Sequence, residues 1–328
     1  MTAFPSVIDW LLESDPAIRW QVLRDLLDAP AEDWQAERAK VETEGWGAAL
    51  LSRQDEDGQW AGGAFMPADY TEEKWRELGQ AWTATCFSLQ QLHEFGLDPA
   101  SERARRTVDL IGRNSRWDEG RQPFWDGEVE ECINARTVTA GVYFGVEVSP
   151  IVTRLLGERQ PDGGWNCERC NGSHRSSFHT TINVLEALLA YQQGVGATPE
   201  TRAARAAGEE YLLKRGLFRR LATGEPVDDR YLKFLYPTRW RYDVLRGLDY
   251  FRAASLAAGT DPDPRLAEAI DHLRSRQSGD GTWPLDWTMK GPVWFEMEGA
   301  GKPSRWITLR ALRVLRWWDA SAAAPRAA

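Results

Sequence analysis

Apolar residues recur along most of the chain at the three- and four-residue spacing of helices that bury one face. In the segment 16–27, for example, one face carries Ile18, Val22, Leu23 and Leu26. This segment also begins with a proline, a residue favoured at helix starts. Runs of alternating apolar and polar residues with paired turns, the pattern of strands, are nearly absent. The sequence therefore predicts an all-α protein.

Two kinds of predicted helix alternate along the chain. The more apolar helices, expected to be buried, cover residues 16–27, 78–95, 133–146, 178–193, 241–257 and 304–318. The more polar helices cover residues 5–13, 32–53, 100–113, 149–159, 199–215 and 263–276. They form six pairs if the N-terminal helix lies beside the last one. We expect one domain over 1–318 and a disordered, Ala-rich tail over 319–328.

Three related turns separate paired helices. They read Gln-Asp-Glu-Asp-Gly-Gln-Trp at 54–60, Gln-Pro-Asp-Gly-Gly-Trp at 160–165 and Gln-Ser-Gly-Asp-Gly-Thr-Trp at 277–283. The Asp can cap backbone amides, and the Gly can adopt a left-handed conformation. The Gln and Trp are then expected to staple neighbouring repeats together. Less regular copies of the turn cover 121–127 and 213–220.

Composition and charge exclude several classes of protein. The chain has 328 residues, of which 42% are hydrophobic, so it can bury a large core. A net charge of −9 argues against general binding to nucleic acid. The four cysteines do not resemble a disulfide framework, which favours a reducing, cytoplasmic location. Neither an export signal nor a run of eighteen apolar residues is present, so no membrane span is predicted.

The segment 162–180 concentrates side chains that can bind a metal. Cys167 and Cys170 form a Cys-x-x-Cys motif, and His174 and His179 follow closely. Cys132 lies one repeat upstream. Thiolates and imidazoles at such spacing are typical zinc ligands. The alternative is an intracellular redox pair at Cys167 and Cys170.

The Gln-x-x-Asp-Gly-x-Trp turns resemble those of squalene-hopene cyclases and of protein prenyltransferase β subunits. This resemblance covers residues 1–318 and implies a six-pair α/α toroid. In the prenyltransferase subunits, an Asp-x-Cys pair and the His of a Tyr-His-Thr segment hold zinc at the starts of successive inner helices. The matching segments here are Glu130-Glu131-Cys132 and Phe178-His179-Thr180. The preferred zinc ligands are therefore Cys132, Cys167, Cys170 and His179, with His174 and Glu130 as substitutes.

The starts of the predicted inner helices also carry arginines and aromatic rings. The residues expected to bind a ligand are Arg136, Arg241, Arg305, Trp240, Tyr242 and Trp306. Aromatic walls with converging guanidinium groups would suit an amphiphilic anion, either isoprenoid-like or carboxylated or phosphorylated. Asp243 and Glu130 are candidate acid–base residues.

Two functional classes stay open. In the first, zinc with three protein ligands and an open position acts as a Lewis acid in an enzyme. In the second, zinc with four protein ligands stabilises a toroid that serves as a receptor or scaffold. The chain lacks the Asp-x-Asp-Asp motif of the cyclases and the Asp-Asp-x-x-Asp diphosphate motif. Their absence favours the scaffold, whereas the prenyltransferase-like position of the zinc ligands favours the enzyme.

Overall fold

A computed structural model describes residues 6–323 of the chain. Helices dominate the described residues, and the extended segments form only isolated β-bridges. The prediction of an all-α protein is therefore confirmed. The chain divides into two compact units. Unit 1 lies within 1–37, 210–288 and 298–328, and unit 2 within 38–209 and 289–297.

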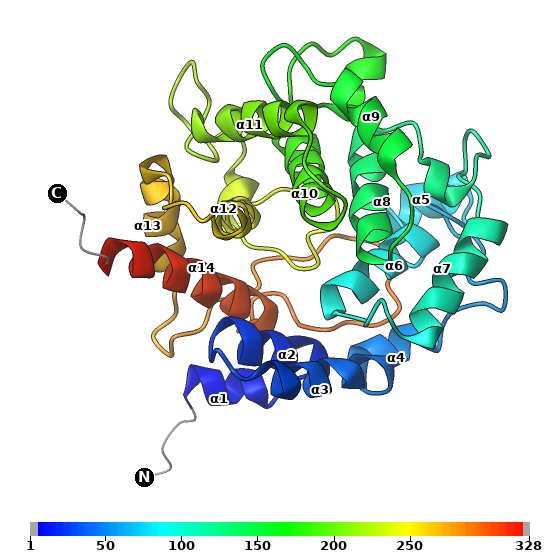
Figure 1. Ribbon diagram of the computed structural model, residues 1–328, viewed down its shortest axis with the longest axis horizontal. Helices are drawn as coiled ribbons and strands as arrows, with labels where there is room; N and C mark the ends of the chain where they lie inside the picture. The colour runs from blue at the N-terminus through cyan, green and yellow to red at the C-terminus, as the bar shows by residue number, and fades with distance from the viewer. Residues whose placement is uncertain (1–5, 324–328) are drawn as a thin grey trace. The chain divides into compact units, whose positions relative to one another are not determined.

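The helices of unit 2 pack in chain order. They are α4 (Gly45–Leu51), α5 (Glu72–Leu78), α6 (Thr85–Phe95), α7 (Glu102–Asn114), α8 (Glu131–Tyr143), α9 (Ser149–Gly157) and α10 (Phe178–Gly194). Helix α4 packs on α6, α6 on α8, and α8 on both α9 and α10 (Figure 1). The unit boundaries fall within α3 (Ala31–Ala39) and α11 (Pro199–Leu213).

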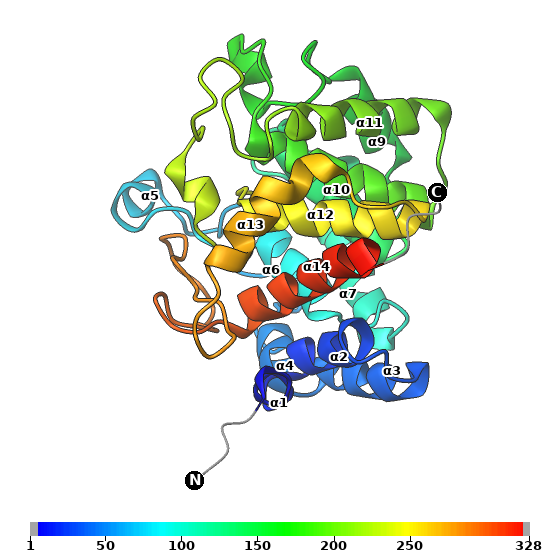
Figure 2. The ribbon, with the colours of Figure 1, turned by 90° about the vertical axis from the view of Figure 1, so that its left-hand side faces the viewer.

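The helices of unit 1 bring the two ends of the described chain together. They are α1 (Val7–Leu12), α2 (Pro16–Asp25), α12 (Val244–Ala258), α13 (Ala267–Ser275) and α14 (Arg305–Ala323). Helix α14 packs between α2 and α12, and α13 covers α12 (Figure 2). Because α14 reaches Ala323, the first part of the expected tail is helical, whereas 324–328 lie outside the described residues.

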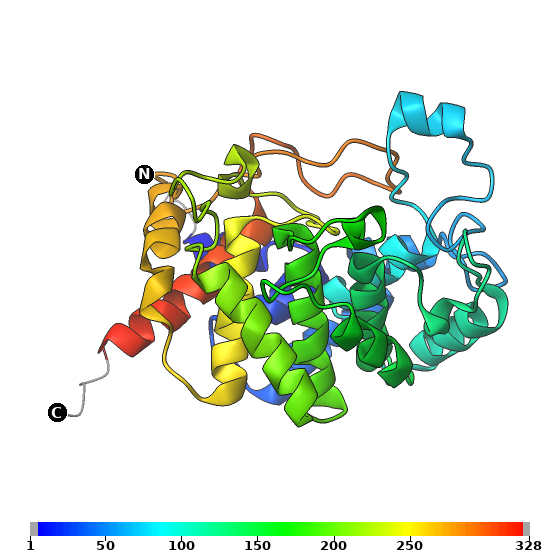
Figure 3. The ribbon, with the colours of Figure 1, turned by 90° about the horizontal axis from the view of Figure 1, so that it is seen from above.

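Two predicted helices differ from the structure: the segment 32–53 is divided into α3, the short 3-10 helix η1 (Lys40–Glu42) and α4, and the helix expected over 78–95 starts late. The segment 79–84 is not helical, and α6 begins only at Thr85. The polar helix α5, which the pattern did not predict, precedes it. Seen from above, α5 lies beside the segment 289–297 (Figure 3), where the Lys290 ammonium donates to the Glu77 carbonyl at 3.0 Å. No helix within 6–323 is long and apolar enough to cross a membrane.

The tryptophan of each repeat turn is fully buried and makes the same hydrogen bond. Each indole N–H donates to the carbonyl ten residues earlier, from Trp60 to Leu50 at 2.8 Å, from Trp165 to Leu155 at 2.7 Å and from Trp283 to Leu273 at 2.8 Å. The accepting carbonyls belong to the polar helices α4, α9 and α13. Each tryptophan therefore fixes the turn to the helix that precedes it.

The backbone amide of the same tryptophan binds the helix that follows. Trp60 donates to the Thr85 hydroxyl at 3.1 Å, Trp165 to Thr181 at 3.1 Å and Trp283 to Thr308 at 3.0 Å. These threonines lie in α6, α10 and α14. Each turn thus joins the two helices of one pair. The polar atoms of the tryptophans bind within their own repeat, whereas contacts to the next repeat come from the Gln54 amide, which donates to the Thr107 hydroxyl of α7 at 3.1 Å, and from the Trp165 ring, which lies against Gly208 of α11.

Replacing Trp165 by phenylalanine tests this role. The change removes the indole donor and leaves the buried Leu155 carbonyl without its partner, so we expect a loss of about 1–3 kcal/mol in the free energy of unfolding. Urea titration followed by circular dichroism would measure it. Trp75→Phe is the control, since Trp75 is 39% exposed on α5. Equal effects of the two substitutions would contradict the assignment.

Candidate metal centre

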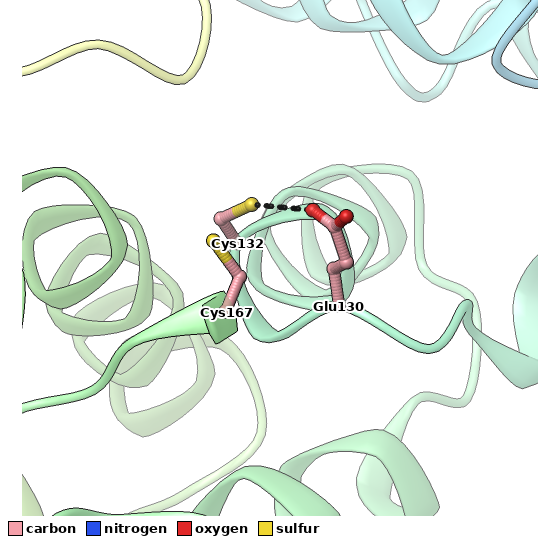
Figure 4. Close-up of side chains that lie close together, drawn as sticks. All are labelled: Glu130, Cys132 and Cys167. Atoms are coloured by element: carbon pink, nitrogen blue, oxygen red, sulfur yellow. Dashed lines mark hydrogen bonds between the residues drawn. The ribbon is translucent and has the colours of Figure 1, made fainter. Parts of the chain in front are cut away.

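Three potential ligands from distant parts of the sequence meet in unit 2. One carboxylate oxygen of Glu130 and the sulfurs of Cys132 and Cys167 all lie within 4.8 Å of one another. Figure 4 shows Glu130 and Cys132 at the start of α8 and Cys167 approaching them from a separate loop. The Cys132 thiol lies 3.5 Å from Oε2 of Glu130 and donates to it.

Local hydrogen bonds set the position of Glu130 and Cys132. Glu130 is the N-cap of α8, and Cys132 is the second residue of that helix. The Asn134 side chain accepts from the Glu128 amide at 2.6 Å and donates to the Glu128 carbonyl at 2.7 Å. The Glu128 carboxylate in turn accepts from the Glu130 amide at 2.7 Å. The chain that enters α8 is therefore held at several points, and Cys132 is buried against it.

Cys167 begins a short 3-10 helix, η3 (Cys167–Asn171), in which the Glu168 amide is capped by the Asn166 side chain. Thr180 of α10 holds Cys167 in place. The Cys167 amide donates to the Thr180 hydroxyl at 3.3 Å. The same hydroxyl donates to the Cys167 sulfur at 3.5 Å. The loop is thus positioned by the start of α10.

Arg169 ties the same loop to α8 and α9. It is the second of the two residues between Cys167 and Cys170. Its guanidinium donates to Glu131 at 2.8 Å and to Glu158 at 3.0 Å. Glu131 is buried, so this ion pair is only partly screened by solvent. Sequence reasoning did not single out Arg169 or Thr180. Both residues lie close in sequence to predicted ligands, which is the feature of the sequence that could have identified them.

The surroundings of the two thiols shift their pKa values in opposite directions. A hydrogen bond to Cys167, together with burial, raises the pKa of Cys132 well above its usual value. The same hydrogen bond, aided by the Thr180 hydroxyl, lowers the pKa of Cys167. Burial also raises the pKa of Glu130. Of the two thiols, Cys167 therefore gives up its proton more readily than Cys132.

The donor set fits zinc. Two sulfurs and a carboxylate oxygen match its ligand preferences. Ligands at about 2.0–2.3 Å from a tetrahedral zinc lie roughly 3.3–3.8 Å from one another. The 3.5 Å separation of the Cys132 sulfur and the Glu130 oxygen is within this interval. Small movements of Cys167 would complete such a set.

The other predicted ligands lie outside this group of three. The Cys170 thiol is exposed and donates to the Cys167 carbonyl at 3.4 Å. His179 is the second residue of α10, and its ring is half-buried. His174 is exposed. The structure therefore brings together Cys132 and Cys167, two of the four preferred ligands, and adds Glu130, which the sequence gave only as a substitute.

Two of the predicted ligand-binding arginines, Arg136 and Arg305, make contacts within their own units. In unit 2, the Arg136 guanidinium donates to Asn183 at 2.8 Å and lies 3.4 Å from Glu94. In unit 1, Arg305 donates to the Trp10 carbonyl at 3.3 Å and lies over the Trp10 ring. Both side chains are thus engaged within their own units.

The remaining candidates lie in unit 1. The buried Tyr242 donates to the Leu217 carbonyl at 2.6 Å, and Trp306 is stacked on Tyr236 with ring centroids 4.4 Å apart. Asp243 is fully buried and accepts the amides of Arg246 at 2.7 Å and Leu235 at 3.1 Å. Its carboxylate therefore acts as an N-cap of α12.

Comparisons with known proteins do not assign a family. No family model matches the chain, and no curated protein is significantly similar to it. Among solved structures, a protein from Actinoplanes is 19% identical over 93% of this chain and 90% of its own, with a TM-score of 0.46. The function has to be inferred from the site itself.

Proposed function

We propose that this protein is a zinc enzyme in which Glu130, Cys132 and Cys167 hold one zinc ion and leave one coordination position open. The observation that carries the proposal is the meeting of these three donor atoms within 4.8 Å at the start of α8. A zinc site with three protein ligands is typical of catalytic centres. When bound, the ion would polarise a substrate carbonyl or activate a water or substrate thiol.

The protein's own residues would keep this centre rigid. Thr180 and Arg169 hold the Cys167 loop to α10, α8 and α9, so the two sulfurs keep their relative position. Glu128 fixes the backbone amide of Glu130. A metal centre needs such supporting contacts, because they orient the ligands. We propose an amphiphilic anion as the substrate, in keeping with the arginines and aromatic rings at the starts of the apolar helices.

We also propose that the chain adopts the six-pair α/α toroid of the terpenoid cyclase and protein prenyltransferase superfamily. The order of packing within each unit supports this. In unit 2, α6, α8 and α10 pack in succession, and in unit 1, α12, α14 and α2 do the same. The three Trp turns join polar to apolar helices with the same hydrogen bonds. Such repetition is expected of a ring of helix pairs.

A zinc-stabilised scaffold is the second candidate function. One observation favours it: His179 is placed at the start of α10, adjacent in sequence to Thr180, which touches the Cys167 sulfur. If the His179 ring turned towards the sulfurs, it could supply a fourth ligand. The centre would then be closed, and zinc would stabilise the fold without taking part in chemistry.

Metal analysis of protein purified without added zinc tests the proposal. We expect about one zinc per chain in the natural protein and in Cys86→Ser, because Cys86 lies in α6 outside the ligand group. Cys132→Ser and Cys167→Ser should lose most of the metal. Natural protein without bound metal, even after reconstitution with zinc, would contradict the proposal.

Substitution with cobalt would separate the two candidate functions. Cobalt(II) in this centre should show thiolate charge-transfer absorption from two sulfurs. His179→Ala should leave the spectrum unchanged if three residues hold the ion. A changed spectrum would identify His179 as a fourth ligand and favour the scaffold.

A further inference from the structure

Arg241 lies between two tryptophan rings in unit 1. Its guanidinium carbon is 4.9 Å from the ring centroid of Trp240 and 5.4 Å from that of Trp287. Indole faces attract guanidinium groups and leave the N–H edge of the group available to an acceptor. Trp240 precedes Arg241 in the chain, whereas Trp287 belongs to a loop 46 residues after Arg241.

Two buried donors of this cluster have no acceptor within residues 6–323. They are the Nε–H of Arg241 and the Nε1–H of Trp287. No ion pair joins Arg241 to a carboxylate of the described chain, in contrast to Arg219, Arg230 and Arg276 of the same unit. Buried N–H groups are nearly always hydrogen-bonded in folded proteins. Two unsatisfied donors on side chains that contact each other indicate that an acceptor comes from a ligand.

The loop that carries Arg241 is held in place by buried charged groups. The Arg246 guanidinium donates to the carbonyls of Arg239 at 3.2 Å and Arg241 at 2.6 Å. Asp243 accepts the amides of Leu235 and Arg246. Arg239 has a φ of 51°, a left-handed conformation that is unfavourable for a residue with a side chain. Such a strained and rigidly held backbone is common at ligand-binding sites.

The loop that carries Trp287 is fixed to the same segment. Leu235 and Trp287 form a parallel β-bridge. The Asp286 carboxylate accepts the Phe234 amide at 2.7 Å, and the Asp286 amide donates to the Phe234 carbonyl at 3.0 Å. The two donors are therefore held relative to each other before any ligand arrives, and preorganisation of this kind favours binding.

Charges around Arg241 do not neutralise it. Burial lowers the pKa of Arg241, and the nearby Arg230 lowers it further, while Asp228 and Tyr231 oppose these effects. Asp228 itself forms an ion pair with Arg230 at 2.5 Å. Arg241 is thus a partly desolvated cation, and Asp228, the carboxylate that acts on it, is already paired with Arg230.

We propose that Arg241 and Trp287 form an oxyanion-binding site for the carboxylate or phosphate group of a small organic ligand, whose apolar part packs on Trp240. This inference goes beyond the proposed zinc centre. It lies within unit 1 and does not depend on the zinc ion. Trp287 was not among the residues predicted from the sequence.

Titration with ligands that share one apolar body tests the proposal. The probes are octyl phosphate, octanoate and octanol, with inorganic phosphate to show whether the apolar part is needed. Tryptophan fluorescence and calorimetry would report binding. We expect at least one of the two anions to bind tenfold or more tightly than octanol, which corresponds to about 1.4 kcal/mol. The anion that binds more tightly identifies the head group. Equal binding of all three, or no binding, would overturn the proposal.

Variants locate the site. Arg241→Gln and Trp287→Phe should each remove most of the preference for the anion and leave octanol binding unchanged, whereas Arg241→Lys should retain part of it. Arg219→Gln is the matched control, because Arg219 also lies over a ring, that of Phe218, but is paired with Glu268. Circular dichroism would confirm that the variants are folded. An unchanged anion preference in Arg241→Gln would overturn the assignment.

The same titration in the Cys132→Ser variant separates this inference from the zinc proposal. If that variant has lost its zinc and still prefers the anion, the oxyanion site stands independently of the metal. If the natural protein binds zinc and shows no anion preference, the oxyanion site is wrong and the metal centre is unaffected.

Discussion

Replacing Asp249 by asparagine is expected to lower the free energy of unfolding by about 3–5 kcal/mol, because it removes the negative charge shared by three arginines. Asp249 is buried in α12. One of its oxygens accepts from Arg252 at 2.9 Å, and the other lies 3.4 Å from Arg310. Arg313 binds both oxygens. Since Arg310 and Arg313 belong to α14, this carboxylate joins two of the central helices of unit 1.

The expected size follows from what the substitution leaves behind. The Arg313 side chain is only 14% exposed and retains a long contact of 3.4 Å with Asp25 and a hydrogen bond of 3.2 Å with Gln21. Asparagine keeps the shape of the side chain but not its charge. Removing one partner of a buried ion pair leaves an uncompensated charge, which is more unfavourable than the pair was favourable.

The pH dependence of stability should change in the same variant. Burial alone would raise the pKa of Asp249, but the charges of Arg313, Arg252 and Arg310 outweigh it and hold the pKa far below the usual 3.8. A depressed carboxyl pKa contributes stability at pH values above about 4, which is lost as the pH falls below the unfolded-state value. Asp249→Asn should therefore lose less stability than the natural protein between about pH 5 and pH 2.

Urea titrations at pH 7 and at acidic pH would measure both effects. Asp271→Asn is the control, since Asp271 is exposed on α13 and lies 3.8 Å from Arg274. We expect no measurable change for the control. Similar unfolding midpoints for the two variants at pH 7 would show that the Asp249 cluster does not hold α12 and α14 together.

Zinc is expected to stabilise the metal-free protein strongly. A ligand that binds only the folded state adds about 4 kcal/mol to the free energy of unfolding when its free concentration is 1,000 times its Kd. The ligands come from α8 and from the loop before α10, so they assemble only in the folded chain. We therefore expect chelation to lower the unfolding temperature and zinc to restore it.

Cys167→Ser should abolish this response to zinc, and Cys86→Ser should preserve it. Calorimetry or thermal denaturation followed by circular dichroism, with and without zinc, would measure the difference. The metal-free forms of both variants need to be folded, which the same spectra show. A zinc response that persists in Cys167→Ser would move the metal elsewhere, for example to Cys170 and His179.

Local sequence patterns determined most of the helices. The 3.6-residue periodicity placed α2, α8, α10 and α12 close to their observed positions, because amphipathic spacing depends on nearby residues only. The Trp turns were recognisable for the same reason. Helix α5 and the late start of α6 were missed, since the segment 79–84 reads as apolar and helical. Hydrogen bonds to distant parts of the chain hold it instead, such as that from the Trp82 amide to the Pro292 carbonyl at 2.9 Å.

The cysteines and histidines clustered in the sequence indicated a metal centre, but the tertiary structure decided which residues belong to it. The Cys-x-x-Cys motif suggested that Cys167 and Cys170 act together, whereas in the structure Cys167 meets Cys132. Only three-dimensional packing could show this, because the turn of η3 directs the Cys170 thiol back to the Cys167 carbonyl while Thr180 directs the Cys167 sulfur towards α8.

The partners of the predicted ligand-binding arginines were also decided by the tertiary structure. Arg136, Arg241 and Arg305 have equivalent positions in the sequence pattern, at the starts of apolar helices. Whether a guanidinium already has a partner depends on residues far along the chain: Asn183 binds Arg136, and Trp10 binds Arg305. Arg241 instead meets Trp287, which offers a ring and a second donor but no acceptor. Long-range packing, and not local sequence, therefore determined the partners of each of these arginines.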